Sequence, residues 1–135
     1  MILVDSSGWI EFFTGGGNAA KYGAYLEKTS NVVTPAIVLY EVYKLVKRER
    51  TEEEALLAAA QMQKTRVVPL SESLALAAAD VSLEFRLAMA DSIVYATARA
   101  EDAELVTSDG DLRGLPGVTF LPKPGKDRGN RVKGA

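Results

Sequence analysis

The 135-residue chain contains neither histidine nor cysteine. Without these side chains it cannot build a Ser-His-Asp or Cys-His catalytic arrangement, an imidazole general base, or a zinc site with thiolate or imidazole ligands. It also lacks the disulfide framework that stabilises many small exported domains, so we expect a cytoplasmic protein. If the chain is an enzyme, its chemistry has to come from carboxylates, hydroxyls, lysine or a bound hard cation.

Long apolar runs are absent as well. No stretch approaches the roughly 20 residues that a membrane-spanning helix requires, so we expect no membrane contact. The N-terminal segment has no basic region and reaches a carboxylate at Asp5, which argues against a signal peptide. Hydrophobic residues nevertheless make up 47% of the chain, which is enough to build the core of one domain.

The net charge of −2 is unevenly distributed along the chain. Residues 123–135 hold five basic residues and one acidic residue, a net charge of +4, which leaves −6 for residues 1–122. A basic tail on an acidic body is compatible with polyanion binding, and equally with a solubilising, disordered end. We therefore expect one domain over residues 1–122 and a basic, flexible tail over residues 123–135.

Short apolar runs alternate with longer stretches of helical periodicity. The runs predict strands at residues 2–4, 32–33, 67–68, 105–107 and 118–121. The periodic stretches predict helices at about residues 6–14, 18–28, 34–48, 51–64, 71–86 and 89–102. This alternation is typical of an α/β domain with a central, mainly parallel five-stranded sheet flanked by helices.

Capping residues stand at several of the predicted helix starts. A side-chain oxygen that accepts a hydrogen bond from the first turn stabilises such a start. In chain order, the candidate caps are Ser6 or Ser7, Thr34 followed by Pro35, Thr51 with Glu54 in a capping box, and Ser71 or Ser73.

Two aspartates follow predicted strands. Asp5 comes directly after the first strand, and Asp109 comes two residues after Thr107, which ends the fourth. Ligands of parallel sheets bind at the carboxyl ends of the strands, so we expect both carboxylates at the functional edge of the sheet. Each also has a purely structural interpretation, because Asp5 can cap the following helix and Asp109 can form an Asx-turn.

Two further acids lie on predicted helices. Glu41 has mostly apolar neighbours at helical spacing, and a carboxylate at the margin of a buried face is costly unless it is compensated. Lys44 can compensate it as a surface ion pair, and a metal cation is the other possibility. Asp91 precedes a run of apolar and small residues, where it can cap the helix or be held near the strand ends by close packing.

Four acids at element junctions, in a chain without histidine or cysteine, favour a site for hard divalent cations. Mg²⁺ and Mn²⁺ prefer oxygen ligands and bridge to substrate phosphates. Without a cation, clustered carboxylates would repel one another and raise each other's pKa values. The sequence therefore predicts one or two Mg²⁺ or Mn²⁺ ions at Asp5, Glu41, Asp91 and Asp109.

Four segments resemble, in order and spacing, the motifs of PIN-domain nucleases, and in particular of the VapC-type toxins of toxin–antitoxin pairs: residues 4–13, 34–42, 90–98 and 105–109. The resemblance covers residues 1–122 and implies a single PIN-like domain. It assigns catalysis and metal binding to the same four acids. It implies supporting roles for Ser6, Thr107, Ser108 and Asp111, although Asp111 can instead serve the turn. Leu112 departs from the family, in which an aromatic residue often follows the second aspartate, and this change concerns packing.

The resemblance implies an endoribonuclease that hydrolyses RNA phosphodiester bonds and leaves 5′-phosphate and 3′-hydroxyl ends. We expect single-stranded or looped RNA, because a compact acidic pocket cannot easily reach phosphates flanked by a stacked duplex. The basic residues that can bind phosphates, or else form an ordinary solvated surface, are Lys44, Lys47, Arg48, Arg86 and Arg113.

The toxin resemblance also implies partners. It implies a homodimer and a small antitoxin whose tail fills the active-site groove. The apolar residues of segments 9–13 and 56–62 can contact such partners or belong to the core.

Three other classes fit less well. A non-catalytic PIN-like scaffold that binds RNA or protein would not need all four acids. A phosphoacceptor receiver domain needs a paired acidic site and a lysine at a later strand end. A haloacid-dehalogenase phosphatase needs Asp-x-Asp after the first strand. Neither of the last two patterns is clear in the sequence.

Overall fold

The computed structural model of the chain describes residues 1–124. Its single sheet consists of β1 (Ile2–Val4), β2 (Val32–Pro35), β3 (Arg66–Val68), β4 (Glu104–Thr107) and β5 (Val118–Phe120). The strand order is β3-β2-β1-β4-β5, and every neighbouring pair is parallel. The expected α/β fold with a central five-stranded sheet is confirmed, and the described sheet is parallel throughout.

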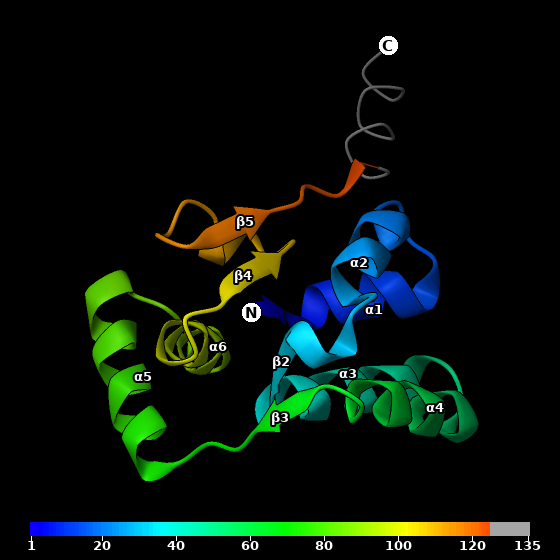
Figure 1. The fold of residues 1–135 in the computed structure, drawn as a ribbon, viewed down its shortest axis with the longest axis horizontal. Helices are drawn as coiled ribbons and strands as arrows, with labels where there is room; N and C mark the ends of the chain where they lie inside the picture. The colour runs from blue at the N-terminus through cyan, green and yellow to red at the C-terminus, as the bar shows by residue number, and fades with distance from the viewer. Residues whose placement is uncertain (125–135) are drawn as a thin grey trace.

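Helices connect the strands of residues 1–124 and pack around the sheet. They are α1 (Ser6–Thr14), α2 (Ala19–Leu26), α3 (Ala36–Glu49), α4 (Glu52–Met62), α5 (Glu72–Phe85) and α6 (Met89–Ala100), with short 3-10 turns η1 (Thr29–Asn31) and η2 (Gly110–Leu112). Successive helices pack in pairs: α1 with α2, α3 with α4, and α5 with α6. In the view of Figure 1, α5 and α6 lie on one side of the molecule and the other four helices on the opposite side.

The starts of α1 and α3 differ from the expected ones. The N-cap of α1 is Asp5 rather than Ser6 or Ser7, and Asp5 Oδ1 accepts a hydrogen bond from the Ser6 backbone N–H at 2.8 Å. The predicted cap of α3, Thr34, is wrong: it lies in β2, and the cap position is Pro35. The reason is that β2 stays paired with β3 as far as Pro35, so the helix begins later than expected.

Two other caps are confirmed. Thr51 Oγ1 accepts a hydrogen bond from the Glu54 backbone N–H at 3.0 Å and begins α4. Ser71 Oγ accepts one from the Leu74 backbone N–H at 3.2 Å and begins α5. These two helices therefore begin where the sequence predicts.

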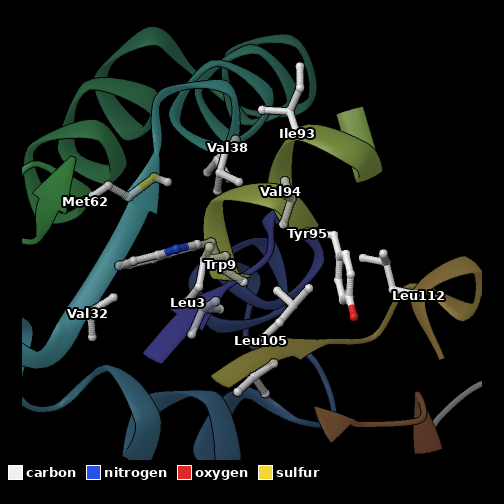
Figure 2. Packing of buried hydrophobic residues seen from close by; sticks show 14 of the residues in the cluster. Leu3, Trp9, Val32, Val38, Met62, Ile93, Val94, Tyr95, Leu105 and Leu112 are labelled. Atoms are coloured by element: carbon white, nitrogen blue, oxygen red, sulfur yellow. The ribbon is translucent and has the colours of Figure 1, made fainter. Parts of the chain in front are cut away.

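The core lies between the sheet and the helices, and Figure 2 shows side chains of β1, β2 and β4 meeting those of α1, α3, α4 and α6. On α3, Val38, Val42 and Val46 form a buried stripe at helical spacing. Each fully buried valine stabilises the fold by about 1.5–3 kcal/mol relative to an exposed one. The stripe holds α3 against the domain and thereby fixes the position of Glu41, next to Val42.

The described chain ends soon after β5. Asn18, buried at the start of α2, donates a hydrogen bond from Nδ2 to the Pro122 carbonyl at 2.8 Å, which secures this end of the domain. Of the expected basic tail, residues 123–135, the part from residue 125 onward lies outside the described residues.

Within residues 1–124, no helix combines the length and the apolar character needed to cross a membrane.

Candidate active site

The carboxyl ends of β1 and β4 bring predicted acids together. Asp5 follows β1, and its backbone N–H donates to the Val106 carbonyl of β4 at 3.0 Å. Asp109 follows β4, and Asp91 lies in the first turn of α6. One carboxylate oxygen from each of the three aspartates lies within 4.8 Å of the others. The connections of the sheet change direction between β1 and β4, and ligands of open parallel sheets bind at such a point.

Burial and mutual repulsion both act on these carboxylates. Asp5 is 3% exposed, and burial raises its pKa, although hydrogen bonds from Thr107 and Ser6 act in the opposite direction. Burial, and after it the charge of Asp109, raises the pKa of Asp91 to about 7. A bound cation relieves the repulsion, and a donor set made only of oxygen suits Mg²⁺ or Mn²⁺. The three aspartates therefore fit a hard divalent cation.

Glu41, the fourth predicted acid, is half-buried on α3 and does not belong to the closely spaced group of residues 1–124. Burial and then the charge of Asp5 raise its pKa, while a hydrogen bond from the Ser6 side chain lowers it. The alternative of a Lys44–Glu41 ion pair is wrong. Lys44 Nζ instead donates to Tyr40 Oη at 3.3 Å, and it makes no ion pair within residues 1–124.

The sequence-family model described as the PIN domain matches residues 2–118 of this chain. The chain belongs to the PIN-domain family. The relationship inferred from four sequence motifs is therefore confirmed. No curated protein sequence matches the chain.

Solved structures show the same fold. A toxin–antitoxin complex from Klebsiella pneumoniae is 25% identical with a TM-score of 0.75, and the match covers 89% of this chain and 97% of that one. VapC20 of Mycobacterium tuberculosis, a toxin that cleaves the sarcin–ricin loop, is 22% identical with a TM-score of 0.68, over 84% of this chain and 92% of that one. VapBC2 from Rickettsia felis, bound to a DNA fragment from its promoter, is 16% identical with a TM-score of 0.70, over 90% and 98%.

Hydroxyl groups hold the acids of this PIN domain in place. Thr107 Oγ1 donates to Asp5 Oδ2 at 2.8 Å and accepts the Asp109 backbone N–H at 2.9 Å. Ser7 Oγ lies 3.3 Å from the same threonine oxygen, and Ser7 must be the donor there because Thr107 gives its only proton to Asp5. Ser7 in turn accepts the Ser108 backbone N–H at 3.0 Å. These hydrogen bonds join the start of α1 to the end of β4 next to the carboxylates.

Ser7 and Tyr22 are members of this network that sequence reasoning missed. Tyr22 Oη lies 2.6 Å from Ser108 Oγ, and burial raises the pKa of Tyr22 to about 12, so the phenol stays protonated. The hydroxyl of Ser108 therefore reaches Tyr22, while the backbone of Ser108 reaches Ser7. Ser7 belongs to the first matched segment, but its partner Thr107 is 100 residues away, so no local pattern points to it.

Asp109 serves the turn and the acidic group of the PIN domain at once. It caps η2, and its Oδ1 accepts the Asp111 backbone N–H at 2.9 Å, as the Asx-turn interpretation requires. The two interpretations are compatible because a carboxylate has several acceptor sites. Asp111 itself is exposed, yet its charge contributes to the raised pKa of Asp91.

The basic residues considered for RNA binding are dispersed over the domain. Lys44 and Arg48 line a groove that also contains Glu41. Lys47 instead forms an ion pair with Glu52, Arg86 ends α5 in the left-handed conformation, and Arg113 lies over the ring of Phe120. Of the five, Lys44 and Arg48 are thus the ones that share a surface with an acid of the candidate site.

Proposed function

We propose that this chain is a Mg²⁺- or Mn²⁺-dependent endoribonuclease of the VapC type, acting in the cytoplasm as the toxin of a toxin–antitoxin pair. The observation that carries the proposal is the group of Asp5, Asp91 and Asp109, whose oxygens lie within 4.8 Å of one another. Within residues 1–124 no basic side chain forms an ion pair with them. The similar structures support the toxin assignment, since they include a toxin–antitoxin complex and a toxin that cleaves the sarcin–ricin loop.

Each residue of the candidate site has its own role in the proposed hydrolysis. Asp5, Asp91 and Asp109 would hold one or two ions, and Glu41 would add a ligand from α3. When bound, such ions supply Lewis-acid stabilisation of the charge that develops on the phosphate oxygens. Thr107 keeps the carboxylate of Asp5 and the backbone of Asp109 in fixed relation. No protein nucleophile is required. The PIN-type resemblance implies that water attacks phosphorus and that the 3′ oxygen leaves, which would give 5′-phosphate and 3′-hydroxyl ends.

An antitoxin is the protein partner that we propose. The apolar residues considered for this contact divide between two environments: Trp9 and Met62 are buried in the core, whereas Leu56 and Leu57 of α4 are more than half exposed. Leu57 and Phe13 line a groove of about 260 Å³ between α1, α3 and α4. We propose that the antitoxin makes its apolar contacts in this groove, while its tail fills the active-site groove, as the resemblance implies. We also propose a homodimer, which light scattering coupled to size-exclusion chromatography would measure.

RNA cleavage by the purified protein tests the nuclease. A fluorescently labelled single-stranded RNA is incubated with Mg²⁺ or Mn²⁺, with EDTA, and with the variants Asp5→Asn and Asp80→Asn. Asp80 is an exposed acid on α5, so its variant controls for the loss of one charge. We expect EDTA and Asp5→Asn to abolish cleavage and Asp80→Asn to leave it unchanged, with 5′-phosphate ends detected by mass spectrometry. Undiminished cutting in EDTA or by Asp5→Asn would disprove the proposal.

Two further outcomes separate the neighbouring interpretations. If the protein binds Mn²⁺ but cuts no RNA, the non-catalytic scaffold is favoured. If expression in a bacterial host arrests growth and Asp5→Asn relieves the arrest, the chain is a toxin. Cleavage in vitro without growth arrest would instead indicate a housekeeping nuclease.

A further inference from the structure

A groove of about 270 Å³ lies beside the acidic site, on the surface of α1 and α3. It is lined by Ser6, Ile10, Tyr40, Glu41, Lys44, Leu45 and Arg48. Glu41 and Ser6 connect this groove to the candidate site, because Glu41 is one of the four predicted acids and the Ser6 backbone N–H donates to Asp5 Oδ1 at 2.8 Å. A polymer that crosses the site can therefore continue along this groove.

Tyr40 is an exposed aromatic residue in that groove. Its side chain is 60% exposed, although it stands one residue before Glu41 on a helix whose other face is buried. Lys44, one helical turn further, places its ammonium 5.4 Å from the centre of the Tyr40 ring and 3.3 Å from Tyr40 Oη. An aromatic surface and a positive charge are thus held next to each other.

The charge of Lys44 is available to a ligand. Among residues 1–124, Lys44 makes no ion pair, whereas the other basic residues of α3 and its end do: Lys47 with Glu52, Arg48 with Glu49, and Arg50 with Glu54. Phosphate is a suitable anion for such an ammonium, and the Tyr40 ring offers an apolar face of the size of a nucleobase.

We propose that Tyr40 stacks on an unpaired base of the RNA substrate and that Lys44 binds the phosphate of the same stretch. This inference rests on the proposed ribonuclease function and adds to it the path of the RNA chain next to the cleaved bond. Stacking on an aromatic side chain requires a base that is free of its own stack, so the contact selects single strands and loops over duplexes. It also tolerates any base, because every base has an aromatic face.

Binding experiments with an uncleaving protein test the stacking contact. All proteins in this experiment carry Asp5→Asn, so that they bind RNA without cutting it. A single-stranded RNA of about ten nucleotides that contains the fluorescent base 2-aminopurine is titrated in Mg²⁺ with this parent protein. The same RNA is titrated with the parent carrying Tyr40→Ala, Tyr40→Phe or the control Leu83→Ala. Leu83 is an exposed apolar residue on α5, away from the groove. We expect Tyr40→Ala to raise Kd about tenfold or more and to abolish the quenching of the base, and the other two variants to behave like their parent.

A second arm tests Lys44 and the single-strand requirement. Lys44→Gln should lower the slope of log Kd against log salt by about 0.7, the value for one phosphate contact of a single strand. Lys28→Gln should not, because Lys28 is exposed and does not line the groove. A blunt duplex of the same sequence should bind more weakly and show no effect of Tyr40→Ala.

The outcomes distinguish this inference from the function on which it rests. If the unsubstituted protein cuts RNA but Tyr40→Ala binds single strands as tightly as its parent does, the stacking inference is overturned. The proposed nuclease activity is then still supported, and the groove is assigned to a protein partner instead. Equal losses for Tyr40→Ala and Tyr40→Phe would also overturn it, because they would assign the effect to the hydroxyl. If the protein neither binds nor cuts RNA, both proposals fail.

Discussion

Thr107, the last residue of β4, donates a hydrogen bond of 2.8 Å to the carboxylate of Asp5, the residue that follows β1. The two residues are 102 positions apart in the chain. The same hydroxyl accepts the backbone N–H of Asp109 at 2.9 Å. One small side chain therefore sets the relative position of two acids of the candidate site.

Thr107→Val should weaken catalysis without removing any carboxylate. Valine has nearly the same shape but leaves Asp5 Oδ2 without its donor, and loss of such a supporting contact to a metal ligand typically costs about 10- to 100-fold in activity or metal affinity. Steady-state RNA cleavage and Mn²⁺ titration measure the two losses. Thr107→Ser should retain most of the activity, and Thr119→Val on β5 should retain all of it. Full activity of Thr107→Val would show that Asp5 is positioned by other contacts.

Asp91 should make the metal-free fold less stable as the pH rises. Its folded-state pKa of about 7 lies above the ordinary value of 3.8, so the folded chain holds this proton more tightly than the unfolded chain. The resulting stabilisation is complete below about pH 4 and is lost between about pH 4 and 7. In EDTA, urea denaturation from pH 5 to 8 should therefore show a larger loss of unfolding free energy for the unsubstituted protein than for Asp91→Asn. Mg²⁺ at pH 8 should reverse the loss in the former, and parallel pH curves would refute the prediction.

Gly8 packs on Tyr22 where a side chain has no room. A Cβ at this position would lie 2.4 Å from Tyr22 Cε1 and 2.6 Å from Val4 Cγ1. Gly8→Ala should therefore displace Tyr22 from Ser108 and lower the free energy of unfolding by about 1–3 kcal/mol in urea denaturation. Gly110→Ala, whose Cβ meets no atom within 4 Å, should change it by less than about 0.5 kcal/mol. Equal stabilities of the two variants would contradict the close packing.

Thr51→Ala should destabilise the start of α4. It removes the oxygen that accepts the Glu54 backbone N–H, and loss of such a cap costs about 1 kcal/mol. Thr51→Ser keeps the oxygen and should keep the stability. Thermal denaturation of the three proteins measures the difference, and the prediction fails if alanine and serine at this position give the same midpoint.

The features that sequence reasoning predicted correctly are local ones. The caps at Thr51 and Ser71 bond to backbone groups three residues ahead, so their pattern is complete within one turn of chain. The sequence predicts Asp5 and Asp109 at strand ends because the apolar runs before them are short and sharply bounded. The prediction of Thr34 as a cap failed because strand pairing with β3, which is not local, extends β2 through Pro35.

The sequence by itself determined the order of the elements, the family and the kind of chemistry available. Periodicity and the absence of histidine and cysteine are properties of the chain before it folds. Only the tertiary structure decided that one carboxylate oxygen of Asp5 and one from each of two other aspartates lie within 4.8 Å of one another, with Glu41 outside this group. It likewise decided that Tyr40 shares a groove with Lys44 beside them. These are distances set by strand order and helix packing, which no short segment of sequence contains.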